Sequence, residues 1–201
     1  MLRYLVDPAN AITAVGLTLA ITGIYCVQIG HIELGLAIVL WALLADHLDG
    51  IVAGRTRNRA PEKGQIGKQL DSFTDLVSDA VFPVLLVLQL NDRSLLSLAI
   101  GAILLLAGAL RLSYFNSFGL SGNSFIGVPL SYDLPALAIL FLLRPLVAPD
   151  AFALLVNATL LVLAGLHVST LRVPKASGAF LAGIVVFSVT ASALLAARGV
   201  A

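Results

Sequence analysis

The chain has few charged residues and almost no cysteine. Only 11% of its 201 residues are Asp, Glu, Lys or Arg, about half of the share usual in globular domains. A water-soluble domain is excluded, because so few polar side chains could not cover its surface. The single cysteine, Cys26, excludes an intrachain disulfide. A formal net charge of +1 provides no basic excess, so we expect no nucleic-acid partner.

Hydrophobic residues make up 59% of the chain and gather in seven long segments. Each approaches the ~20 residues that a helix needs to cross a bilayer. The segments are 11–29, 33–54, 67–91, 94–115, 127–147, 151–169 and 178–198. We therefore expect an all-α integral membrane protein, a polytopic bundle of about six to seven transmembrane helices, forming a single domain over residues 1–201. No signal-peptide cleavage site follows the first segment, which we expect to be retained.

The fifth segment is the weakest of the seven. Pro129, Asp133 and Pro135 interrupt its first half. It is either a full span or a shorter helix preceded by a re-entrant stretch, and the pattern leaves both open.

Basic residues alternate between the two sets of connections. One set holds Arg3, Arg55, Arg57, Arg59, Lys63, Lys68, Arg111, Arg172 and Lys175, and the other holds Arg93, Arg144 and Arg198. The positive-inside rule places the richer set in the cytoplasm. We therefore expect a protein of the cell membrane with its N-terminus inside and its C-terminus outside.

Two pairs of aspartates flank one of these cytoplasmic connections. Asp46 and Asp49 are three residues apart, and Asp71 and Asp75 are four apart, so each pair shares a helical face. A loop of about a dozen residues joins the two helices, which lets them pack as antiparallel neighbours. We expect the four carboxylates to converge near the cytoplasmic interface.

Such a cluster is unfavourable without a partner, since buried like charges repel each other and lose solvation. Oxygen-only ligands suit Mg²⁺ or Mn²⁺, and four aspartates suffice for two ions. Two such ions can clamp a diphosphate. The alternatives are carboxylates solvated at helix ends, carboxylates neutralised by loop arginines, or a proton relay.

The aspartates stand in a pattern that resembles the CDP-alcohol phosphotransferases. That family carries D-x-x-D-G-x-x-A-R followed by G-x-x-x-D-x-x-x-D. The matching positions here are Asp46, Asp49, Gly50, Ala53, Gly67, Asp71 and Asp75. Two features depart from the pattern. The residue after Ala53 is Gly54, with Arg55 one position late, and the connection to Gly67 is longer. Arg55, Arg57 or Arg59 is then the candidate for the phosphate contact.

Other stretches extend the resemblance along the chain. Residues 8–13 resemble the P-N-x-x-T start of the family's first helix, with one residue more between Pro8 and Asn10. Residues 111–116, 125–129 and 167–175 resemble R-L-A-R-F-N, F-x-G-L-P and M-V-S-x-x-x-Y-P-K of bacterial and archaeal phosphatidylserine synthases. Their order favours the serine-using branch of the family.

The resemblance implies a CDP-diacylglycerol–serine O-phosphatidyltransferase that acts at the cytoplasmic face on a CDP-activated lipid (CDP-diacylglycerol or an ether analogue). In this interpretation Asp46, Asp49 and Asp71 bind metal, and Asp75 is the general base and a further ligand. Arg111 holds the serine carboxylate, with Asn116 as a pocket donor. The CDP-lipid site is implied to include Asn10, Thr13, Gly50, Ala53, Arg55 and Gly67. Membrane lipids and a second copy in a homodimer are the implied partners.

Several alternatives stay open. Asn10 and Thr13 are equally well explained as ordinary helix-start residues, and Arg111 as an interface anchor. Asp79 either extends the site, pairs with a buried Arg or His, or stays protonated. The acceptor is serine or another alcohol, such as inositol phosphate, glycerol phosphate, ethanolamine or choline. An ion- or proton-coupled transporter is the alternative of a different class.

Overall fold

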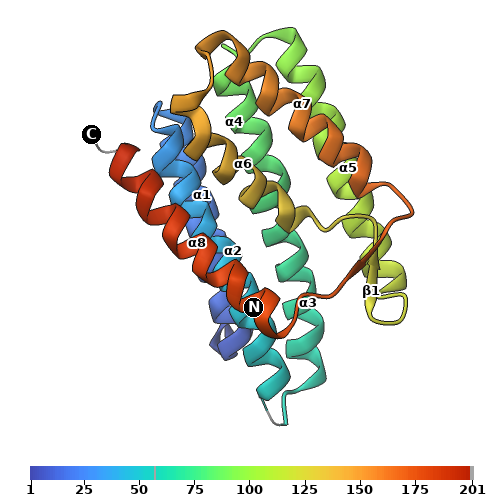
Figure 1. The fold of residues 1–201 in the computed structure, drawn as a ribbon. Coiled ribbons are helices and arrows are strands. Elements are labelled where there is room, and N and C mark those ends of the chain that lie inside the picture. Colours follow the sequence, from blue (N-terminus) through green and yellow to red (C-terminus); the bar gives the residue numbers. More distant parts are fainter. Residues whose placement is uncertain (57, 200–201) are drawn as a thin grey trace.

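The computed structural model describes residues 1–56 and 58–199, and they form a bundle of helices (Figure 1). The helices are η1 (Leu2–Val6), α1 (Pro8–Gln28), α2 (Ile32–Arg55), α3 (Pro61–Asp75), η2 (Leu76–Val81), α4 (Phe82–Leu90), α5 (Leu95–Phe118), η3 (Leu130–Tyr132), α6 (Asp133–Leu143), η4 (Arg144–Leu146), α7 (Pro149–His167) and α8 (Gly178–Gly199). Two short strands, β1 (Ser124–Ile126) and β2 (Arg172–Pro174), pair antiparallel. The predicted all-α fold is confirmed.

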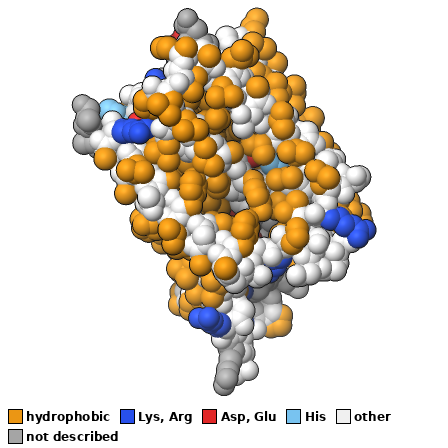
Figure 2. All heavy atoms as spheres, in the orientation of Figure 1, with side chains coloured by type: hydrophobic (Ala, Val, Ile, Leu, Met, Phe, Trp, Pro, Cys, Tyr) orange, Lys and Arg blue, Asp and Glu red, His pale blue; other side chains and the backbone are white. Residues whose placement is uncertain are grey.

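Among the described residues, five helical units are long and apolar enough to cross a membrane. They are α1, α2, the continuous unit Pro61–Leu90, α5 and α8. Large apolar side chains on their outer faces stay exposed, such as Leu98 at 55% and Val186 at 66%. In Figure 2 such side chains cover the middle of the visible face, and Lys and Arg lie toward its margins. A bilayer accounts for this surface, which water would not, and the multi-pass prediction is confirmed.

The fifth predicted segment, 127–147, is a shorter helical unit in the structure. Its α-helix, α6, contains only Asp133–Leu143, and the turns η3 and η4 adjoin it directly. Helical structure thus runs from Leu130 to Leu146, which is fewer than the ~20 residues of a usual span. Shortly before this unit, the chain forms strand β1, which pairs with β2. The turn η4, whose second residue is Pro145, ends the unit. The alternative of a shorter helix is the one observed.

The predicted start of the third span, residue 67, is also wrong. Helix α3 begins at Pro61, so only residues 56–60 separate it from α2. Proline suits the first helical turn, because its missing N–H is not needed there, and Glu62 in the same turn favours the positive end of the helix dipole. Glu62, Lys63 and Gln65 lie in this stretch, and their polar side chains led to the prediction of a loop.

An ion pair ties this connection to the start of α1. Arg59 donates to both carboxylate oxygens of Asp7, at 3.1 and 2.8 Å, and to Oδ1 of Asn10 at 2.7 Å. Asn10 in turn donates to the carbonyl oxygens of Tyr4 and Lys63. Burial alone would raise the pKa of Asp7, but the hydrogen bonds from Arg59 and the Asn10 amide bring that pKa below its ordinary value.

Gly67 is the residue of α3 that lies against this ion pair. A Cβ atom on it would collide with Oδ1 of Asn10 and lie 2.9 Å from Nη2 of Arg59. Glycine is therefore required here by close packing.

Gly67→Ala is expected to destabilise the protein, because Asn10 and Arg59 are held by several bonds and cannot move away together. The matched variant is Gly64→Ala in the same helix, where an added Cβ has no atom within 4 Å. It should be neutral or stabilise by up to about 1 kcal/mol. Thermal unfolding of both detergent-solubilised variants measures the difference. Equal melting temperatures would contradict the packing explanation.

Candidate active site

A cavity of about 750 Å³ opens among α2, α3, η2, α5, α6 and α8. Asp46, Asp49 and Asp71 line one part of it. The walls from α6 and α8 are apolar, and they include Ile139, Phe180, Ile184 and Phe187. The cavity therefore combines an acidic region with an apolar one, which suits an amphipathic ligand.

The acidic region comes from two neighbouring helices. Ligand oxygens of Asp46, Asp49 and Asp71 lie within 4.8 Å of one another. Asp49 is buried and accepts a hydrogen bond from the hydroxyl of Thr13 on α1. Throughout 1–56 and 58–199, no Lys or Arg forms an ion pair with these three carboxylates. The nearest basic side chain is that of His47, whose Nδ1 lies 3.5 Å from Oδ2 of Asp46. Hard, oxygen-only donors without a Lys or Arg partner fit a divalent cation such as Mg²⁺ or Mn²⁺.

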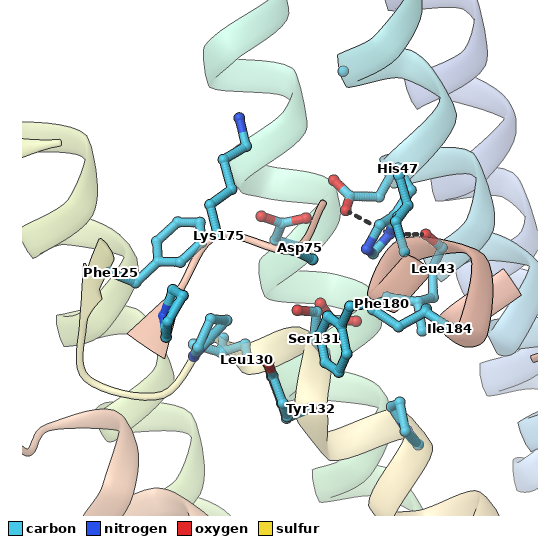
Figure 3. A pocket seen from close by; sticks show the side chains of 18 of the residues that line it. Leu43, His47, Asp75, Phe125, Leu130, Ser131, Tyr132, Lys175, Phe180 and Ile184 are labelled. Carbon is cyan, nitrogen blue, oxygen red and sulfur yellow. Dashed lines mark hydrogen bonds and ion pairs between the residues drawn. The ribbon is translucent and has the colours of Figure 1, made fainter. Parts of the chain in front are cut away.

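Asp75 lies outside this group of three but lines the same cavity. Figure 3 places it on the α3 wall, between Phe125 and Lys175 on one side and Phe180 and Ile184 of α8 on the other. Directly after it, the helix widens into the π-helical turn η2, which carries Asp79 into the cavity lining. Such turns are frequent at functional sites.

Arg111 of α5 faces the same cavity with an unusual lack of partners. Arg111 is only 7% exposed, and its Nε and Nη2 atoms form no hydrogen bond with any described residue. Its guanidinium carbon lies 5.5 Å from the ring centre of Phe115 and 5.2 Å from that of Phe125. The alternative of an interface anchor is wrong, because the side chain lies inside the bundle. Two aromatic rings hold the cation in place and leave donors free for a ligand.

Two stretches that resemble the phosphatidylserine synthases meet at this cavity. Residues 125–129 and 167–175 supply the paired strands, in which Phe125 lies opposite Val173. Gly127 has φ of +73°, and a Cβ there would collide with the carbonyl oxygen of His167. Just beyond the ladder, Lys175 also lines the cavity. The pairing brings parts of the chain about 50 residues apart to one wall of the site.

The residues expected at the site differ in their contacts. Thr13 donates a hydrogen bond to Asp49, whereas Asn10 accepts one from Arg59 of the Arg59–Asp7 ion pair. Of the small residues, Gly50 lines the cavity, while Ala53 and Gly67 do not. Asn116 also lies outside the lining, since it exchanges hydrogen bonds with Ser72 at 2.9 and 3.1 Å and so joins α5 to α3.

The three arginines considered for the phosphate contact also differ in their surroundings. Arg59 is committed to Asp7 and Asn10. Arg55, at the last position of α2, is exposed and lies outside the cavity lining. Arg57 lies outside the described residues.

His167 and Asp133 form a closed pair between α7 and α6. Their nearest atoms, Nε2 and Oδ1, are 3.1 Å apart, and both side chains are fully buried. The other ring nitrogen of His167 lies 2.9 Å from the carbonyl oxygen of Val128. Both ring nitrogens of His167 are thus engaged within the bundle. Asp133 is absent from the cavity lining and so has no contact to offer a ligand there.

Phe115, Phe180 and Lys175 also line the cavity, although none of them was predicted as a site residue. Phe115 and Lys175 stood within stretches that resemble the synthases, whereas Phe180 is one apolar residue among many. Only the packing of α8 across the cavity distinguishes it.

Comparison with known proteins agrees with the geometry. The family model for CDP-alcohol phosphatidyltransferase matches residues 7–170. The chain belongs to the CDP-alcohol phosphatidyltransferase family. An archaetidylserine synthase of Methanothermobacter thermautotrophicus is 35% identical over 102 residues, 50% of this chain and 43% of that protein. A CDP-diacylglycerol–serine O-phosphatidyltransferase of Methanocaldococcus jannaschii is 33% identical over 157 residues, 77% of this chain and 69% of that protein.

The alignments thus span less than half of the first relative and about two thirds of the second. The family match includes the whole aspartate pattern and every helix from α1 to α7. Proteins of this family are transferases of phospholipid synthesis, and they generally depend on a divalent metal.

Proposed function

We propose that this CDP-alcohol phosphatidyltransferase transfers the phosphatidyl group of a CDP-lipid, CDP-diacylglycerol or an ether analogue, to L-serine and releases CMP. One observation carries the proposal. The same cavity joins three uncompensated carboxylates, an unpartnered arginine and an apolar wall. These features match the diphosphate, the serine carboxylate and the lipid, respectively. The names of the two relatives support serine as the acceptor.

In this proposal Asp46, Asp49 and Asp71 hold Mg²⁺ or Mn²⁺, and Asp75 is close enough along the helix to contribute to a second ion. When bound, such cations supply positive charge to the diphosphate and acidify a nearby hydroxyl. Thr13 orients Asp49 by its hydrogen bond. Gly50 keeps the adjoining cavity wall free of side-chain bulk.

The chemical step is an in-line substitution at phosphorus. The serine hydroxyl oxygen forms a bond to the lipid-side phosphorus, and the bond from that phosphorus to the oxygen of CMP breaks. Asp75 accepts the hydroxyl proton, and its position in the cavity lining, outside the group of three clustered carboxylates, supports this role. Arg111 binds the serine carboxylate, because its planar guanidinium can donate two parallel hydrogen bonds.

The location and assembly of the protein follow the same reasoning. The basic connections and the acidic part of the cavity lie at corresponding ends of α2 and α3, which supports an active site at the cytoplasmic face of the cell membrane. The homodimer is supported by the family resemblance, and native mass spectrometry in detergent tests it.

An acceptor panel tests the proposed reaction. Purified protein is incubated with CDP-diacylglycerol, Mn²⁺ and, in separate reactions, serine, inositol phosphate, glycerol phosphate, ethanolamine or choline. CMP release should require serine. When the serine is isotopically labelled, the phospholipid product should carry the label. CMP release with inositol phosphate but not with serine would overturn the proposed acceptor while leaving the reaction type intact. Ion flux without any CMP release would overturn both.

A further inference from the structure

Asp79 is a buried carboxylate that the proposed transfer does not use. It lies in η2, is 4% exposed, and lines the same cavity as Asp75 and Arg111. Its Oδ1 accepts one hydrogen bond, from the hydroxyl of Ser78 at 2.9 Å. Within the described part of the chain it forms no ion pair. A buried carboxylate with one neutral partner is costly, so a cationic ligand would be favoured there.

Arg111 is a buried cation that lacks hydrogen-bond partners. Two of its three nitrogen atoms are buried without a partner. The helix that carries it, α5, packs against η2, which carries Asp79. The two residues are nevertheless more than an ion-pair distance apart, because no bridge joins them in the described residues. Among the described residues, the cavity therefore has one cationic and one anionic side chain on adjoining walls, neither of which forms an ion pair.

Both groups lie beside the proposed base. Asp79 follows Asp75 by four residues, close to one helical turn, so the two carboxylates point to the same side of the helix. Arg111 lines the same cavity as both acids. An acceptor whose hydroxyl meets Asp75 would place its neighbouring groups at Asp79 and Arg111.

We propose that Asp79 and Arg111 together recognise a zwitterionic acceptor, a 2-amino-3-hydroxy acid. Asp79 binds its ammonium group and Arg111 its carboxylate. This inference rests on the proposed function and adds the contact that selects the acceptor. A phosphorylated polyol would be repelled by Asp79 and has no ammonium group to offer. Ethanolamine would leave Arg111 unpartnered, and such an unmade bond is the stronger source of selectivity.

The test compares serine with 3-hydroxypropanoate, which has the same skeleton without the ammonium group. We expect Asp79→Asn to lower kcat/KM for serine about tenfold or more, mainly through KM, since a charge-assisted hydrogen bond is lost. Its kcat/KM for 3-hydroxypropanoate should stay near the low wild-type value. Asp92→Asn is the matched control, because this exposed aspartate lies in the turn before α5 at the far end of the bundle. It should leave both values unchanged.

The ratio between the two acceptors separates recognition from structure. An equal loss with both, accompanied by loss of CDP binding, would overturn the proposal and make Asp79 a structural residue. A second measurement needs no variant: in the wild-type protein, 3-hydroxypropanoate should compete with labelled serine at least about tenfold more weakly than unlabelled serine does. Equal competition would also overturn the proposal. A wild-type protein that uses another acceptor in place of serine would instead overturn the proposed function, and the two failures are thus distinguishable.

Discussion

Replacing Asp75 by Asn should reduce serine-dependent CMP release by about 10²–10⁴-fold, the usual contribution of a general base. The amide cannot accept the serine proton, yet it has nearly the same shape as the carboxylate. Asp75 lies outside the group of three clustered aspartates. Cation-dependent CDP binding by the variant should therefore fall far less than its turnover. Initial rates and CDP binding, measured on one detergent preparation, check both statements.

Asp92→Asn provides the control for this variant also, because it makes the same chemical change on an exposed turn. It should retain wild-type rates. If Asp75→Asn retained a substantial part of the activity, the proton would have to go elsewhere, and the assignment of the base would be wrong. If CDP binding disappeared together with turnover, Asp75 would act chiefly as a metal ligand.

Removing a carboxylate from the cluster should have the second large effect. Asp71→Asn is expected to lower CMP release by about 10²–10³-fold, a typical cost of losing one group that stabilises developing charge. It replaces one oxygen anion among the three that lie within 4.8 Å of one another. The remaining two would bind a divalent cation more weakly, since affinity rises with the number of charged ligands.

Cation binding can be measured apart from catalysis. Added Mn²⁺ should raise the melting temperature of the wild-type protein, and treatment with EDTA should reverse the rise and abolish CMP release. Asp71→Asn should show a much smaller rise, while Asp92→Asn should behave as wild type. An unchanged Mn²⁺ response in Asp71→Asn would contradict the assignment of this residue as a ligand.

The long spans were predictable because their apolar residues have no alternative to the bilayer. Helix α6 was harder, since the chain before it satisfies its backbone by pairing with β2, and β2 lies about 50 residues further on. The early start at Pro61 was missed for a different reason. Residues 61–66 include the polar Glu62, Lys63 and Gln65, and a hydrogen bond from Asn10 to the carbonyl oxygen of Lys63 joins this first turn to α1.

In the site, too, some features were predictable from the sequence and others were not. Helical spacing alone brought Asp46, Asp49 and Asp71 together, because two antiparallel helices with acids on facing sides allow little else. The roles of isolated polar residues could not be predicted in this way. Asn10 and Asn116 turned out to join helices, since their amide groups found partners within reach. Within the described residues, Nε and Nη2 of Arg111 have no hydrogen-bond partner. Whether a polar side chain has a partner thus depends on residues far away in the chain.

By itself, the sequence determined the membrane environment, the family pattern and the acidic cluster, because these depend on composition and on spacing within single helices. Tertiary structure decided which residues share a cavity. It separated Asp75 from the three clustered aspartates, committed Arg59 to Asp7, and placed Asp79 and Arg111 on adjoining walls, where neither forms an ion pair within the described residues. The physical reason is that hydrogen-bond partners and burial come from packing between distant segments, which no local pattern specifies.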